Sequence, residues 1–197
     1  MIRVSKEELD PQHLLVLYAV NKAPNGVPTK THYQKMMYLI LKALGNDPRV
    51  SAGYVPDHFG PYSASVDQWR SALLEYGYLE KNSKERITVN PEVQSEVDSI
   101  HFPDLMTARK IESISEFVNS LTYNQLLLYI YSDDIDKKEG MTERSDIVNE
   151  IMSSRKSIAA SMVKSEKVSL AKGAELANMD ILDFKNYIKK SESHAHV

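Results

Sequence analysis

The chain has 197 residues, of which 42% are hydrophobic and 26% are charged, with a formal net charge of −3 and no cysteine. The lack of cysteine excludes disulfides, thiol nucleophiles and cysteine-based metal sites. No apolar run approaches the roughly 20 residues that a membrane-spanning helix needs. The first residues lack the apolar core of a signal peptide. We therefore expect a cytoplasmic protein that does not bind membranes.

The first half of the chain is predicted to form three helices followed by a hairpin. Apolar residues recur at helical spacing, with Pro, Thr or Ser near each start and Gly near two of the ends. The predicted elements are a buried helix over 11–23, a helix from Thr29 or Thr31 to Gly45, an extended segment over 50–62, a helix from Ser63 to Gly77 and a β-hairpin over 78–89.

This order is typical of a winged helix, so we predict a mainly α fold with a small β-hairpin. We assign residues 1–100 to a winged-helix-like N-terminal domain and residues 101–150 to a helical connector. Within and beyond the connector we expect an amphipathic helix over 106–120, a buried helix over 122–131, an exposed acidic loop over 133–140 and a helical segment over 142–168 that breaks once.

Residues 151–190 are predicted to form a helix-turn-helix domain, and residues 191–197 a disordered tail. Asn178 can adopt the left-handed conformation that ends many helices, and Asp180 can cap the next helix. Small residues at the crossing allow the two helices to approach closely. The residues expected to face inward are Leu170, Ala174 and Ala177 on the first helix and Ile181, Phe184 and Ile188 on the second. This geometry can place a second helix in the major groove of DNA.

The distribution of charge is more informative than its sum. Residues 109–150 carry five basic and nine acidic side chains, a net charge of −4, whereas residues 151–190 carry eight basic and four acidic side chains, a net charge of +4. DNA-binding domains are usually basic because phosphate neutralisation carries much of their affinity. The predicted helix-turn-helix therefore lies in the part of the chain where DNA contact is electrostatically permitted.

Two motifs in the first half resemble the Panacea domain. They are Tyr33-Gln34-Lys35-Met36-Met37-Tyr38-Leu39-Ile40 and Phe59-Gly60-Pro61-Tyr62-Ser63, the second followed by a helix that closes on Tyr76-Gly77-Tyr78-Leu79. They are similar to that family's Lys-containing helix and to its Gly-Pro turn before a third helix. Panacea domains are known mainly as antitoxin modules of prokaryotic toxin–antitoxin pairs, so the resemblance implies a protein partner.

The run from Ser169 to Ala177 resembles a second family, that of small prokaryotic helix-turn-helix proteins often regarded as antitoxin-like. Its members usually carry Gly at the position of Asn178 and Ser or Thr at the position of Asp180. Both changes are physically equivalent here, because Asn tolerates the left-handed conformation and Asp caps helices.

The two candidate reading helices differ in their outward faces. With Val66, Trp69 and Leu73 inward, the helix after Ser63 turns Asp67, Gln68, Ser71 and Glu75 outward. Its two carboxylates repel phosphate, which favours a protein-binding face.

The last helix turns Leu182, Asp183, Asn186, Lys189 and Lys190 outward, with Lys172 near the turn. Asn can pair with an adenine edge and Lys with phosphate, so Lys172, Leu182, Asn186, Lys189 and Lys190 form the predicted DNA-binding set. The alternative is a three-helix subdomain used for packing or dimerisation.

No nucleophile, phosphate-loop or dinucleotide motif is present, and no histidine pair has metal-ligand spacing. We therefore predict no cofactor, no metal and no catalysis; the enzymatic alternative is a site assembled from Asp57, His58, Tyr62 and Glu75. The favoured hypothesis is a non-catalytic prokaryotic regulator of the antitoxin kind, a homodimer that binds a protein partner such as a toxin and the DNA of its own operon. The alternative is a protein-interaction adaptor without DNA binding.

Overall fold

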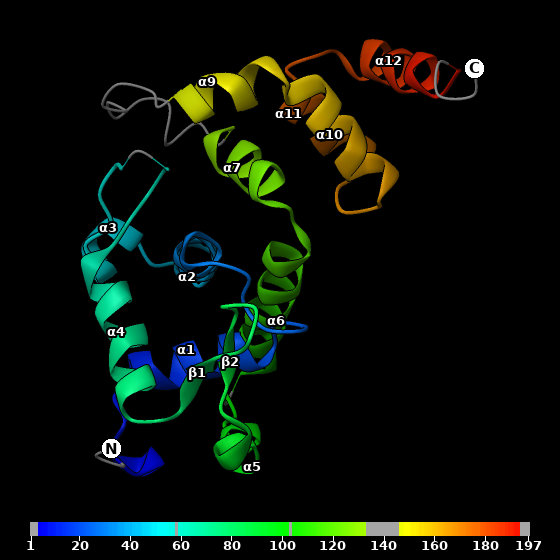
Figure 1. Ribbon diagram of the computed structural model, residues 1–197. Coiled ribbons are helices and arrows are strands. Elements are labelled where there is room, and N and C mark those ends of the chain that lie inside the picture. The colour runs from blue at the N-terminus through cyan, green and yellow to red at the C-terminus, as the bar shows by residue number, and fades with distance from the viewer. Residues whose placement is uncertain (1–3, 58, 103, 133–145, 194–197) are drawn as a thin grey trace. The chain divides into compact units, whose positions relative to one another are not determined.

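The computed structural model describes residues 4–57, 59–102, 104–132 and 146–193 (Figure 1). It divides into two compact units. Unit 1 comprises Met1–Val55 with Pro61–Ser120, and unit 2 comprises Pro56–Gly60 with Leu121–Val197. The fold is mainly helical with one two-stranded antiparallel sheet among the described residues, as the sequence predicts. No helix in the described ranges is both long and apolar enough to span a membrane.

Unit 1 is built around a buried central helix. Its elements in chain order are η1 (Lys6–Glu8), α1 (Pro11–Asn21), α2 (Lys30–Ala43), α3 (Pro48–Ala52), α4 (Ala64–Glu75), β1 (Leu79–Lys81), β2 (Ile87–Val89), η2 (Pro91–Val93), α5 (Gln94–Asp98) and α6 (Leu105–Ser120). Helix α2 lies between α4 and α6 (Figure 1). Its residues Tyr33, Met36, Met37 and Ile40 are completely buried.

The helix starts follow from local capping. The Thr29 hydroxyl accepts a hydrogen bond from the backbone N–H of His32, and the Ser63 hydroxyl accepts one from that of Val66. Each such cap satisfies a backbone donor that the first helical turn leaves free. The predicted hairpin is confirmed, with Leu79 opposite Val89 and Lys81 opposite Ile87.

The prediction of an extended segment over 50–62 is wrong in its first part. Helix α3 occupies its start, because Asp47 caps the N–H of Arg49, Pro48 fits the first helical turn and Gly53 ends the helix at φ +63°. Among the residues of this segment that the structure describes, extended pairing consists of one antiparallel bridge between Val55 and Tyr62.

The division into units differs from the predicted domains. The predicted connector, residues 101–150, is split between the units, because α6 packs on α2 in unit 1 whereas the next helix belongs to unit 2. The predicted acidic loop lies outside the described residues. The predicted tail begins too early, because helix α12 (Ile181–Ser193) continues into it; residues 194–197 are not described.

Unit 2 contains α7 (Tyr123–Tyr131), α9 (Asp146–Ser153), α10 (Arg155–Lys164), α11 (Leu170–Ala177) and α12. The predicted break in the helical segment falls between α9 and α10. Helices α10, α11 and α12 meet at Gly173, where an added Cβ would lie 2.8 Å from Phe184 Cε1 and still closer to Val163 Cγ2. The close approach therefore depends on Gly173 as well as on the buried Ala174 and Ala177.

We predict that Gly173→Leu lowers the free energy of unfolding of unit 2 by about 2 kcal/mol, because overpacking outweighs the gain in helix propensity. Urea unfolding followed by far-UV circular dichroism measures this. The fluorescence of Trp69, the single tryptophan, reports unit 1 and is expected to be unchanged. Ala171→Leu is the matched control, because Ala171 is exposed on the same helix. Equal stability of the two variants would contradict the proposed close contact.

Candidate functional site

The joint between α11 and α12 has the geometry that the sequence predicts. Asn178 adopts the left-handed conformation (φ 52°, ψ 52°) at the end of α11. The backbone N–H of Met179 donates back to the carbonyl of Ala174 at 3.0 Å, which closes the helix end. The Asp180 carboxylate then accepts a hydrogen bond from Leu182 N at 2.8 Å and so caps α12. Both predicted capping roles are confirmed.

Helix α12 is attached to its unit through a narrow contact. Phe184 is completely buried, whereas Ile188 is half-buried and Ile181 is 42% exposed. The prediction that Ile181 faces inward is therefore wrong, because the contact centres on the Phe184 ring against Gly173. A hydrogen bond of 3.0 Å from Lys164 Nζ to Ser191 Oγ also joins the helix to α10.

The outward residues predicted on α12 are all exposed. They are Leu182 (68% exposed), Asp183, Asn186, Lys189 and Lys190. Spacings of three, four and seven residues place them on one continuous face. The sequence reasoning missed Lys185, which is also exposed. The sequence does not show how little of α12 is buried: among the side chains of α12 whose burial the structure describes, Phe184 is fully buried and most of the others are exposed.

Lys172 belongs to a different set of contacts. Its ammonium group lies 2.7 Å from Glu175 Oε1 and 5.4 Å from the centre of the Tyr129 ring on α7. Its charge is therefore paired inside unit 2, and the structure does not group it with the exposed face of α12.

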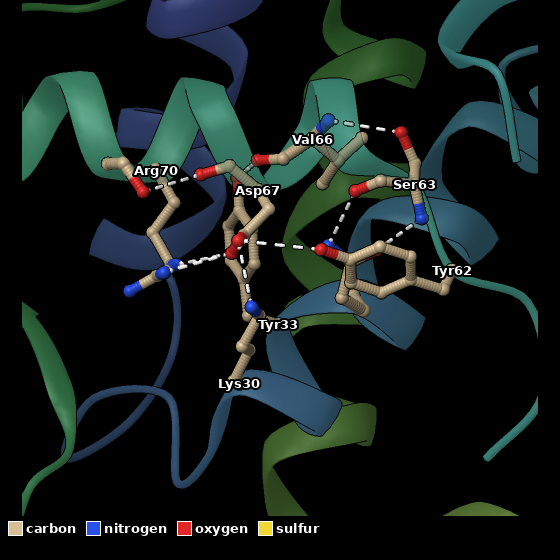
Figure 2. A network of polar contacts seen from close by, with 9 residues as sticks. Lys30, Tyr33, Tyr62, Ser63, Val66, Asp67 and Arg70 are labelled. Atoms are coloured by element: carbon tan, nitrogen blue, oxygen red, sulfur yellow. Dashed lines mark hydrogen bonds and ion pairs between the residues drawn. The ribbon is translucent and has the colours of Figure 1, made fainter. Parts of the chain in front are cut away.

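The predicted partner-binding face of α4 is divided by the structure. Gln68, Ser71 and Glu75 are exposed as predicted. Asp67, by contrast, is the centre of an ion-pair network and only 21% of its side chain is exposed (Figure 2). Its carboxylate lies 2.8 Å from Lys30 Nζ and 2.9 Å from Arg70 Nη2, and the Tyr62 hydroxyl donates to it at 3.5 Å.

The balance of forces on Asp67 favours its ionised form. Burial acts to raise the pKa of this carboxyl, but hydrogen bonds and charge from Lys30 and Arg70 outweigh burial and hold the pKa below its usual value. The expectation that Asp67 turns outward and repels phosphate is therefore wrong, because most of its side chain is buried and two cations neutralise its charge.

The motif residues that resemble the Panacea domain are joined by buried hydrogen bonds. The side-chain amide of Gln34 and the backbone of Ser63 exchange two bonds, of 2.9 and 3.0 Å. Lys35 is 2% exposed and donates to the carbonyl of Pro61 at 2.6 Å. The Ser63 hydroxyl donates to the carbonyl of Ala52 while it accepts from Val66 N. These contacts hold the turn against α2, and their role is structural.

Two members of the alternative enzymatic set, Tyr62 and Glu75, lie far apart in unit 1. Tyr62 precedes α4 and Glu75 ends it, so the 12-residue helix separates them by about 18 Å. The Tyr62 hydroxyl is bonded to Asp67, and His58 lies outside the described residues. In the described ranges, no three His, Asp or Glu side chains converge on a point where they could hold a metal ion.

The chain matches no protein-family model, and no curated protein or solved structure matches it either. The candidate surfaces are therefore defined by geometry and chemistry: the exposed face of α12, the exposed part of α4 and the polar network beneath α4.

We predict that Asp67→Asn lowers the free energy of unfolding of unit 1 at pH 7 by about 1–2 kcal/mol, because it removes a charge-assisted network. The pKa of Asp67 is depressed in the folded state, so its contribution is complete above the unfolded pKa of about 4 and is lost as the pH falls further, through the folded pKa. The variant should therefore lose less stability than the wild type between pH 5 and pH 2, as measured by urea unfolding with Trp69 fluorescence.

Glu75→Gln is the control for this experiment, because Glu75 is an exposed carboxylate on the same helix. We expect it to change stability at pH 7 by less than about 0.5 kcal/mol. The same acid sensitivity in Asp67→Asn as in the wild type would show that the network does not contribute to the acid dependence.

Proposed function

We propose that the protein is a non-catalytic DNA-binding regulator in which α11 and α12 form a helix-turn-helix and α12 enters the major groove. The observation that carries this proposal is the exposure of α12: a sharp left-handed joint positions the helix, the buried Phe184 ring anchors it, and the side chains of its polar face are exposed. In a helix-turn-helix protein, the second helix lies in the major groove and its side chains contact base edges.

The exposed residues suit DNA chemically. The Asn186 amide can make paired hydrogen bonds to an adenine edge, and Leu182 can contact a thymine methyl group. Lys189 and Lys190, with Lys185 beside them, supply charge for phosphate contacts. Asp183 is unfavourable near phosphate but can accept a hydrogen bond from cytosine. Because a single short helix buries little surface, we propose that the protein binds DNA as a homodimer.

For unit 1 we propose a winged-helix fold of the Panacea-like kind. Helices α1, α2 and α4, with the short α3 between α2 and α4, precede the hairpin, and Val27 between α1 and α2 forms an antiparallel bridge with Ile87 of β2. The buried bonds among the Panacea-like motif residues support the same assignment.

We propose further that unit 1 binds a protein partner through Gln68, Ser71 and Glu75 on α4, and that the pair acts as an antitoxin with its toxin. Asp67 supports this surface from beneath and does not belong to the exposed face. If the partner and DNA favour the same state of the protein, each strengthens binding of the other by an equal factor.

An adaptor without DNA binding is the second candidate. Ile181 and Leu182 are exposed apolar residues at the start of α12, and such residues suit a protein interface. Salt distinguishes the two functions, because DNA binding loses affinity steeply as the salt concentration rises whereas an apolar protein contact does not.

We predict that Lys189→Ala weakens binding to all DNA sequences and lowers the slope of log K against log salt by about one, because one phosphate contact is lost. Asn186→Ala should instead weaken binding mainly at one base position, by about 1–3 kcal/mol. Sites selected from fragmented genomic DNA, followed by fluorescence anisotropy at several salt concentrations, measure both effects.

Lys110→Ala is the control, because it removes an exposed lysine of α6 in unit 1 that lies outside every proposed binding surface. It should leave the salt slope and the sequence preference unchanged. Unchanged binding in both α12 variants would remove this helix from the interface and favour the adaptor.

We predict that Ser71→Arg disrupts co-purification of the protein partner from the native host, because it places a bulky cation in the centre of the α4 face. Ser51→Arg is the matched control: both serines are exposed helical residues whose hydroxyls donate to the carbonyl four residues earlier. Retention of the same stoichiometric partner by Ser71→Arg would exclude this face as the binding surface.

A further inference from the structure

An open polar cavity lies at the surface of unit 1. It has a volume of about 630 Å³ and lies among the end of α1, the turn that follows, the β1–β2 hairpin and the start of α5. Figure 1 shows these elements next to one another. The polar residues that carry the argument are Asn21, Asn82, Ser83, Lys84, Arg86 and Gln94.

The turn and the hairpin together form one wall of the cavity, and hydrogen bonds fix them to each other. Val27 and Ile87 exchange backbone hydrogen bonds of 2.8 and 3.0 Å. Gly26 has φ +76°, and an added Cβ there would lie 2.7 Å from the carbonyl oxygen of Ile87. The Arg86 guanidinium donates to the carbonyls of Asn25 and Gly26 at 2.8 and 3.2 Å. The cavity is therefore formed in advance of any ligand, as small-molecule sites usually are.

Hydrogen-bond donors are in excess at the hairpin end of the cavity. Arg86 has five N–H groups, and its two bonds to carbonyls use only part of them. Asn82 Oδ1 accepts from the backbone N–H groups of Lys84 and Arg86, which leaves the amide nitrogen of Asn82 as a donor. In the part of the chain that the structure describes, no carboxylate forms an ion pair with Lys84 or Arg86. Two cations without a carboxylate partner favour an anionic ligand.

The opposite end of the cavity is polar and uncharged. The Gln94 amide donates to Asn21 Oδ1 at 2.8 Å, and both amides donate to Asp98, at 2.9 and 3.0 Å. Asp98 does not line the cavity; it holds the two amides in place. This end suits hydroxyl or ring-nitrogen groups rather than charge.

We propose that this cavity binds a soluble phosphate-bearing molecule of about mononucleotide size, with the phosphate at Arg86 and Lys84 and the polar remainder toward Asn21 and Gln94. Its volume is within the range of small-molecule sites. A guanidinium group binds phosphate through paired hydrogen bonds, and lysine adds charge. The cavity would give the protein a ligand-binding function independent of α12 and of the α4 face.

The test is a titration of the ¹⁵N-labelled full-length protein with AMP, followed by NMR. We expect AMP to shift the side-chain signals of Asn21, Asn82, Gln94 and the Nε–H of Arg86. Adenosine, which lacks the phosphate, should bind at least tenfold more weakly. Lys84→Gln should weaken AMP binding about five- to tenfold. Lys81→Gln, on the same hairpin but paired with Glu85 outside the cavity, should leave binding unchanged.

Arg86→Lys is the second variant, because it keeps the positive charge and removes the planar guanidinium group that can make paired hydrogen bonds to phosphate. Trp69 fluorescence verifies that unit 1 remains folded, and weaker AMP binding by the folded variant supports the proposal. Three results would overturn it: no shift of these signals with AMP up to 10 mM, equal binding of adenosine and AMP, or equal effects of the Lys84 and Lys81 variants. A short DNA duplex that shifts the same signals more strongly than AMP at equal phosphate concentration would also overturn it, because it would assign the cations to a nucleic-acid backbone.

Discussion

Unit 1 depends on a buried polar contact between α2 and the turn that precedes α4. Gln34 and Ser63 satisfy each other, and Lys35 satisfies the carbonyl of Pro61. Each of these groups, if left buried without a partner, would cost about 1–3 kcal/mol. The contact positions Ser63, whose hydroxyl then caps α4. Helix α4 leads directly into the hairpin, and the hairpin forms one wall of the polar cavity.

In unit 2, the last helix packs on its neighbours over a small area. The last three helices of the unit meet at Gly173, where the absence of a side chain lets the Phe184 ring approach the backbone of α11. Because a single ring supplies the anchor, most of α12 remains outside the core. A broader apolar face would have stabilised the helix but would have buried the residues that we propose for DNA contact. The limited packing is therefore compatible with the proposed DNA contact, whereas fuller burial would not be.

The net charge of −3 does not describe the local charge of the cavity in unit 1 or of helix α12. Several acidic side chains are engaged within the fold: Asp67 pairs with Lys30 and Arg70, Asp98 accepts from two amides, and Glu112 pairs with Lys22. The cavity cations have no such partner among the described residues, and α12 carries three exposed lysines. Local pairing, rather than composition, decides which charges are available to a ligand.

The sequence by itself determined the features that arise from neighbouring residues: the caps at Ser63 and Asp180, the left-handed turn at Asn178, the hairpin and the exposed face of α12. Only the tertiary structure decided that Asp67 lies in an ion-pair network, that Gly173 sets a three-helix contact and that Arg86 lines a polar cavity. Caps and turns depend on backbone groups a few residues away, which a sequence displays directly. Ion pairs, close helix contacts and cavities depend on residues far apart in the chain, and their distances exist only after the chain has folded.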